Sequence, residues 1–281
     1  MNRRVQVLGT LALLGFLNQP VLGGAAVTDS GSKLALPTGA KAAWLIQPGK
    51  ALPSGTRFDL DRQGNVWLLP VPNLLTRVDG AGVAMREPVR DLVFVNGVLS
   101  LVSDIAAGGL QVLKREHVRS GSVRRQLLLP GPGWRLADGG AAGAVAYGVD
   151  QDSGQSWLLR LKDRRKLLAL PERILAVLGR PDGWYLSTPG GLLKVTSAGT
   201  VTHLGRVPGG ASSLAWVDKA GLVAAGPQGA ALVSGGKAWP FLLTPNPRVR
   251  ARGANLYVLV PFNGAVLKIT GLHAPASVDK E

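Results

Sequence analysis

The sequence predicts an all-β protein with the architecture of a six-bladed β-propeller, and three observations lead to this prediction. The 281 residues include 38 Gly and 19 Pro, and only 17% are charged, which is typical of short strands joined by tight turns. Apolar segments that run into a proline recur about every 40 residues. Each interval holds four strand-like pieces, and a unit of that length and content is typical of a propeller blade.

Six prolines mark the repeats, because a proline lacks a ladder donor and belongs at the end of an outer edge strand. They are separated by 40, 42, 41, 37 and 37 residues: Pro48, Pro88, Pro130, Pro171, Pro208 and Pro245. Within an interval, a turn tip such as Asn96-Gly97 precedes an apolar strand. A third strand with a cation between apolar neighbours follows, and the four pieces predict a four-stranded antiparallel blade.

The N-terminal outer strand is expected to close the ring. The last repeat ends after its third strand near Thr270, whereas the apolar segment Trp44–Gln47 has no repeat before it. Pairing the two would remove two exposed edges. We therefore expect a linker at 27–42, the propeller at 43–272 and a C-terminal tail at 273–281. A β-helix or open solenoid is the alternative, but its period would be shorter and its strands parallel.

The first 26 residues predict a secretory signal peptide. Arg3 and Arg4 precede an apolar run of 13 residues from 5 to 17, and small residues follow from 23 to 26. That run is shorter than the roughly 20 residues that a membrane-spanning helix needs. We expect Sec-type export with cleavage near residues 23–26, and a mature protein that is periplasmic or extracellular.

Two repeats resemble a known group of propellers. The segment 61–68, Asp-Arg-Gln-Gly-Asn-Val-Trp-Leu, with Leu-Thr-Arg-Val-Asp-Gly-Ala-Gly at 75–82, is similar to the repeat of NHL-type and gluconolactonase-like (senescence-marker-protein-like) six-bladed propellers. A second copy lies at 190–201. For the gluconolactonase-like members, the resemblance implies a divalent cation on the channel axis. The candidate ligands would be Asp59, Asp91, Glu172 and Asn255.

A cation stands at the opening of nearly every repeat, where the chain crosses from an outer strand to the next inner strand. The five arginines predicted to bind a ligand are Arg57, Arg90, Arg135, Arg173 and Arg248. The axial channel of a propeller opens on this face, so their guanidinium groups would converge on a carboxylate or phosphate. The alternative is that they face outward or pair with Asp59, Asp91 and Glu172.

A second basic region belongs to the long turns of the second and third repeats, which are expected side by side on the opposite face. The residues predicted to contact a partner are Arg124, Arg125, Lys162, Arg164, Arg165 and Lys166. Such a region suits an acidic protein, anionic lipid headgroups in a peripheral membrane contact, or an acidic cell-envelope polymer. Nucleic acid is not expected, because of the export signal and because aromatic residues do not alternate with the cations.

The composition and the motifs favour binding over catalysis. The chain has no Cys, its three His lack ligand spacing, and 32 Lys and Arg against 17 Asp and Glu give a formal charge of +15. We expect no catalytic residue, no metal and no cofactor. The predicted function is a non-catalytic binding or scaffold module for an anionic ligand or acidic protein, acting as a monomer or within a larger assembly. The alternative is a gluconolactonase-like, metal-dependent lactone or ester hydrolase.

Export of the full chain is expected to yield a mature protein that begins near Ala25 and carries a formal charge of +13, because Arg3 and Arg4 are removed from a chain of charge +15. Intact mass spectrometry of the exported fraction measures both the start and the mass. Retention of Met1 in that fraction would contradict the export prediction.

Overall fold

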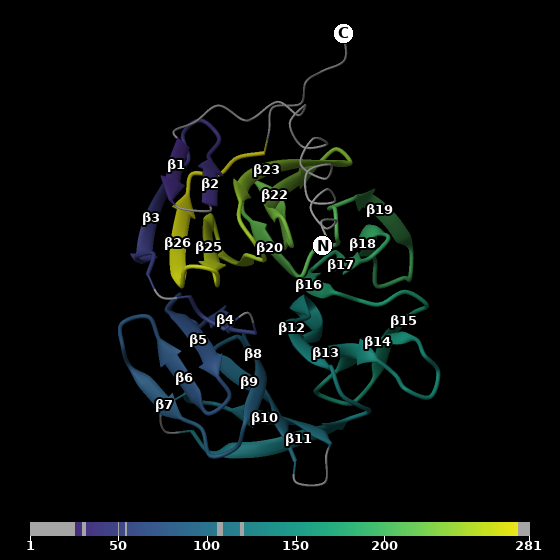
Figure 1. Ribbon diagram of the computed structural model, residues 1–281. Coiled ribbons are helices and arrows are strands. Elements are labelled where there is room, and N and C mark those ends of the chain that lie inside the picture. The colour runs from purple at the N-terminus through teal and green to yellow at the C-terminus, as the bar shows by residue number, and fades with distance from the viewer. Residues whose placement is uncertain are drawn as a thin grey trace, which may run out of the picture.

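The structure, a computed structural model, is a closed ring of six β-sheets around a central axis (Figure 1). It describes residues 26–29, 32–49, 51–53, 55–105, 109–118 and 121–274. Within these ranges the regular structure is β apart from the 3₁₀ helix η1 (Gly140–Ala142). None of the helical structure in this part of the chain has the length and apolar character to cross a membrane. The predicted six-bladed, all-β architecture is confirmed.

The first three blades follow the chain in order from the inner to the outer strand. Blade 1 contains β4 (Arg57–Leu60), β5 (Val66–Val71), β6 (Leu74–Arg77) and β7 (Gly82–Ala84). Blade 2 contains β8 (Val89–Val95), β9 (Val98–Asp104), β10 (Leu110–Arg115) and β11 (Val123–Leu129). Blade 3 contains β12 (Arg135–Asp138), β13 (Ala144–Val149), β14 (Ser156–Arg160) and β15 (Lys166–Leu170).

Blade 4 follows the same plan, whereas blades 5 and 6 differ at their outer edges. Blade 4 contains β16 (Ala176–Arg180), β17 (Gly183–Thr188), β18 (Gly191–Val195) and β19 (Val201–Gly205). Blade 5 contains β20 (Ser213–Val217), β21 (Gly221–Gly226), β22 (Gly229–Ser234) and β23 (Lys237–Leu243), extended by β2 (Ser32–Ala35) and β1 (Ala26–Asp29). Blade 6 contains β24 (Arg248–Arg252), β25 (Asn255–Val260), β26 (Ala265–Thr270) and β3 (Lys41–Ile46).

Ring closure follows the predicted route. Strand β3 pairs antiparallel with β26, and Ile46 lies opposite Val266. The segment 27–42, which we expect from the sequence to be a linker, carries strands β1 and β2, and β2 pairs with β23. Leu34 and Leu36 are buried there, because their alternate spacing puts both on the apolar face of blade 5. The predicted signal peptide lies outside the described residues except for Ala26, and the predicted tail is described only at His273 and Ala274.

Apolar side chains fill the spaces between neighbouring blades rather than one central core. Each of six buried clusters joins two adjacent sheets; Trp67 of blade 1, for example, packs with Phe94 of blade 2 at 6.3 Å between ring centroids. The middle strands of a blade are therefore buried on both faces. On β25, for example, the successive residues Val258 and Leu259 point to opposite faces and are both buried. This packing leaves the polar residues of the inner strands free to face the axis.

The meander gives the ring two distinct faces. Each blade begins on the face that carries the connections from outer to inner strands, near the six repeat prolines; we call it the crossover face. The opposite or hairpin face carries the turns between first and second strands and between third and fourth strands. One such turn, Asn96-Gly97, has φ values of 52° and 79°, which a two-residue type I′ hairpin requires.

Deleting residues 27–48 is expected to cause aggregation and loss of cooperative unfolding, because the edge of β26 would lose its partner β3. A shorter truncation that begins at Pro37 keeps β3 and is the matched control. It should unfold cooperatively but at lower stability, by about 1.5–3 kcal/mol for each of the two leucines whose burial it loses. Calorimetry and size-exclusion chromatography measure the difference, and an unchanged melting transition after the longer deletion would show that β3 does not hold the ring closed.

Candidate functional site

Side-chain acceptors of one blade bind backbone N–H groups of the next blade around the axis. The Phe94 N–H donates to Asp59 Oδ2 at 2.7 Å, and the Leu136 N–H donates to Asp91 Oδ2 at 2.7 Å. Serine hydroxyls do the same at the next three junctions, where the acceptors are Ser156, Ser187 and Ser213. At the sixth junction Arg250 of blade 6 contacts Asp59 of blade 1. A polar bond therefore crosses every junction between blades.

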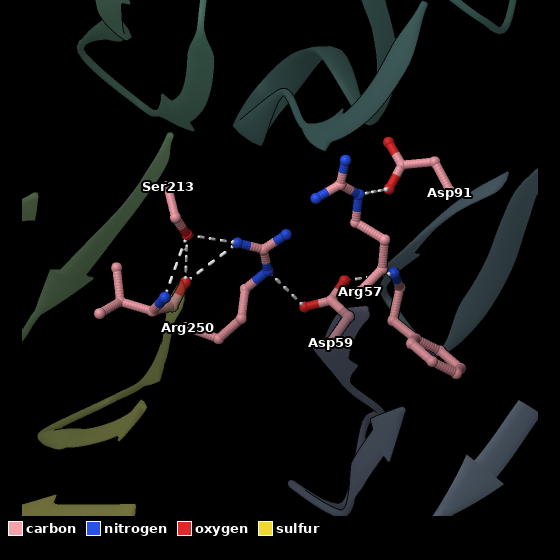
Figure 2. Close-up of polar contacts among 7 residues, drawn as sticks. Arg57, Asp59, Asp91, Ser213 and Arg250 are labelled. Atoms are coloured by element: carbon pink, nitrogen blue, oxygen red, sulfur yellow. Dashed lines mark hydrogen bonds and ion pairs between the residues drawn. The ribbon is translucent and has the colours of Figure 1, made fainter. Parts of the chain in front are cut away.

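Two ion pairs stand at the centre of this arrangement (Figure 2). Arg250 Nε donates to Asp59 Oδ1 at 3.0 Å, and its Nη1 donates to Ser213 Oγ at 3.1 Å. Arg57 Nε lies 3.6 Å from Asp91 Oδ1. Both carboxylates are buried, with 6% of each residue exposed. Each therefore depends on its arginine and its backbone donor to offset the loss of water.

Burial shifts the ionisation of these groups. It raises the pKa of Asp59, against the opposing effects of Arg250 and the Phe94 N–H. Burial likewise raises the pKa of Asp91, with Arg57 as the main opposing charge. Arg57 Nη1 is buried and makes no hydrogen bond within the described residues. The axis thus holds a guanidinium whose donors are only partly satisfied.

A cavity of about 240 Å³ opens on the crossover face beside this network. Three arginines from three blades line it: Arg135 opens β12, Arg173 precedes β16 and Arg248 opens β24. Tyr147 and Ser212 add hydroxyl groups, and prolines, glycines and aliphatic residues form the remaining wall. No acidic residue is among the described residues that line it. We call this space the crossover-face cavity.

The innermost arginine of the cavity is perturbed by its surroundings. Burial, together with the nearby guanidinium of Arg57, lowers the pKa of Arg248 to about 10. Arg248 therefore remains a cation at neutral pH, but its charge is incompletely solvated. Burial raises the pKa of Tyr147, whose hydroxyl donates to Leu175 O at 3.4 Å and stays neutral.

The structure brings together three of the five arginines predicted to bind a ligand. Arg57 is held by Asp91 beneath the crossover-face cavity and does not line it. Arg90 is exposed and pairs with Asp104 at 2.6 Å. A β-bulge between Val89 and Asp91 explains the difference, because the extra residue turns Arg90 out of the register that Arg57 keeps on β4. In the sequence, Arg57 and Arg90 each lie seven residues before a hairpin glycine, Gly64 or Gly97, and this equal spacing does not reveal the bulge.

The residues that the resemblance implied as metal ligands are dispersed. Asp59 and Asp91 are held by arginines on the axis, Glu172 is exposed on the crossover face, and Asn255 begins β25 on the hairpin face. Across the described part of the chain, no three His, Cys, Asp or Glu side chains group so that they would hold a metal ion. The second basic region is exposed on the hairpin face, at β11 and the turn between β14 and β15.

A second cavity, also of about 240 Å³, opens on the hairpin face. Its lining combines Asp61 and Asp138 with Arg180, Arg250 and Arg252, so its charges are mixed. It shares Tyr147 and Ser212 with the crossover-face cavity, which places the two openings on one axis. Of these two cavities, the crossover-face cavity is the one whose described lining combines several cations with no carboxylate.

No protein-family model and no curated protein matches the sequence. Among solved structures, the chain is similar to the holo form of the PQQ domain of pyranose dehydrogenase from Coprinopsis cinerea, with a TM-score of 0.53, 12% identity, and coverage of 85% of this chain and 97% of that one. It is also similar to the extracellular domain of a two-component-system protein from B. thetaiotaomicron (TM-score 0.50, 12% identity, 79% of this chain and 39% of that one). BamB from Moraxella catarrhalis gives a TM-score of 0.48 at 12% identity, over 84% of this chain and 98% of that one. At these identities the similarity shows the propeller fold alone.

Replacing Arg250 with Gln is expected to lower the free energy of unfolding at pH 7 by about 2–4 kcal/mol, because the buried carboxylate of Asp59 loses its cation. The loss raises the folded-state pKa of Asp59 further. A carboxyl whose pKa is raised on folding binds more protons in the native state, so stability falls as the pH rises from the unfolded towards the folded pKa. The deficit relative to wild type should therefore be smaller at pH 4 than at pH 7.

Urea denaturation at the two pH values measures this deficit. The Arg250→Gln, Asp59→Asn double variant is the control, since it has no carboxyl to titrate and should lose the extra pH dependence. Equal deficits at both pH values in the single variant would mean that Arg250 stabilises the ring through packing rather than through its charge.

Proposed function

We propose that the protein is a non-catalytic binding propeller that takes a small anionic group, a carboxylate or phosphate, into the crossover-face cavity. The observation that carries this proposal is the convergence of Arg135, Arg173 and Arg248 on one cavity whose described lining contains no acidic residue. Guanidinium forks match the planar geometry of a carboxylate and the oxygens of a phosphate. Cations from three blades around one small space also add their fields.

The position of Arg248 strengthens the case for an anion. Its pKa is lowered to about 10 because it is buried beside another guanidinium, so the unliganded cavity holds charge at a cost. An anion bound between Arg135 and Arg248 would offset that repulsion. The aliphatic wall at Ile174 and Leu175 suits an apolar part of the same ligand.

The cavity volume limits the ligand. At about 240 Å³ it lies slightly below the usual range for drug-sized ligands, roughly 300–1,000 Å³. A small mono- or dicarboxylate, a phosphate ester, or the anionic end of a larger molecule fits such a space. The carboxylate of an acidic side chain on a protein partner would be recognised by the same guanidinium groups.

The predicted signal peptide at 1–26 supports a location for this activity outside the cytoplasm, in the periplasm or the extracellular space. The resemblance of segments 61–82 and 190–201 to NHL-type repeats accords with a binding or scaffold role. The lactone or ester hydrolase alternative has less support, because the carboxylates it needs near the axis, Asp59 and Asp91, are held by arginines. We therefore propose binding without catalysis.

The Arg135→Gln, Arg248→Gln double variant tests the site. Each charge-assisted contact to a bound anion contributes about 1.5–3 kcal/mol, so losing both should weaken binding by about a hundredfold or more. Isothermal titration calorimetry with inorganic phosphate, citrate, succinate and glucose 6-phosphate measures the affinities. Arg135→Gln with Arg173→Gln is a second variant that leaves the buried Arg248 in place, with a smaller expected loss because Arg173 is exposed.

The matched control is Arg86→Gln with Arg90→Gln, which removes the same charge from exposed positions on the same face but outside the cavity. Its affinity should stay within about threefold of wild type, since screened charges at that distance contribute little. An equal loss in both double variants would reduce the effect to general attraction by a basic protein and refute the cavity as the site.

A further inference from the structure

The hairpin face carries a concentration of positive charge that the crossover-face cavity does not use. Residues 114–125 and 160–166 contain ten Lys and Arg against two acidic residues. Seven of the exposed or half-buried cations of these segments form what we call the basic patch: Lys114, Arg124, Arg125, Lys162, Arg164, Arg165 and Lys166. Such a concentration of like charge produces a strong local positive potential, which attracts anionic partners.

The fold brings the two segments together. Blade 2 and blade 3 are neighbours in the ring (Figure 1). Strands β10 and β14 both run towards the hairpin face, and strands β11 and β15 both start from it. One buried cluster contains Val112 and Leu127 of blade 2 together with Leu161 of blade 3. Leu161 directly precedes Lys162, so the packing of the two blades fixes the positions of both turns.

The basic patch contains repulsion that the fold leaves uncompensated. Lys114 lies directly opposite Arg124 across the pair β10–β11, and like charges in that position destabilise a sheet. Asp163, one of the two acidic residues, already pairs with Arg160. Within the described ranges, none of the seven cations of the patch takes part in an ion pair with a carboxylate.

The exposure of the patch argues for a broad anionic surface rather than a shaped pocket. Its arginines stand on strand ends and turn tips, and Val123, which is 46% exposed, lies beside Arg124. Protein interfaces are centred on apolar and aromatic residues and are depleted in Lys. The basic patch, in contrast, contains three Lys and is not centred on apolar or aromatic side chains. Nucleic-acid strands need exposed aromatic faces, whereas Trp157 is half-buried with Lys166 Nζ 4.3 Å from its ring centroid.

We propose that the basic patch docks the propeller peripherally on the surface of an anionic lipid bilayer. Long, flexible cations at turn tips reach headgroup phosphates independently, and an exposed valine among them can enter the interface. The hairpin face then lies against the membrane. The crossover-face cavity, on the opposite face, opens away from the bilayer towards its ligand.

Co-sedimentation with vesicles tests this proposal on the mature protein. Wild type should bind vesicles of 30% phosphatidylglycerol in phosphatidylcholine and should not bind pure phosphatidylcholine, with binding weakened by salt. Replacing Arg124, Arg125, Arg164 and Arg165 with Gln should reduce binding by at least a hundredfold, since each surface cation contributes about fivefold. This variant should melt no lower than wild type, because it removes like charges.

The matched control replaces Lys33, Arg86, Arg90 and Arg206 with Gln, four exposed cations that lie away from the hairpin face. It should bind vesicles within about threefold to fivefold of wild type. Equal losses in both quadruple variants, or equal binding to neutral vesicles, would overturn the proposal. The proposal would also be overturned if soluble polyphosphate bound as tightly as vesicles and its binding depended on the patch in the same way. The partner would then be an anionic polymer. Calorimetry with citrate on the patch variant keeps this result separate from the cavity, whose affinity should be unchanged.

Discussion

The hydrogen bonds that cross from each blade to the next around the axis are the interactions on which the rest of the structure depends. A sheet whose faces are both apolar packs against its neighbours, but apolar contact alone does not fix the distance or register between two inner strands. Asp59, Asp91 and Ser213 fix it by accepting backbone N–H groups of the following blade. Arg250 completes the circle by reaching Asp59 across the junction between the last blade and the first.

This arrangement also determines the charge of the two openings. The buried carboxylates at the axis form structural ion pairs, Asp59 with Arg250 and Asp91 with Arg57. Neither carboxylate is among the described residues that line the crossover-face cavity, where Arg135, Arg173 and Arg248 converge. The positive lining of that cavity is therefore a consequence of how the ring is held together, and it is the basis on which we propose an anionic ligand.

The two faces expose different chemistry for a topological reason. Crossover connections are short and rich in proline, so they form a rigid rim around a small cavity. Turns between third and fourth strands lie at the outer part of the hairpin face, where the cations of blades 2 and 3 remain exposed. A small ligand suits the first environment and an extended anionic surface suits the second.

The sequence by itself determined the all-β class, the number of blades and the closure of β3 onto β26, because each follows from spacings along the chain: the proline period, the Asn-Gly turn at 96–97 and an unpaired first strand. It also named Arg135, Arg173 and Arg248 among its candidates. Only the tertiary structure decided which arginines share a cavity, since the bulge at Arg90 and the pairing of Arg57 with Asp91 depend on contacts between neighbouring strands and blades. The bond between Asp59 and Arg250 joins residues 191 positions apart, and a repeat period carries no information about which side chains meet across the closing junction.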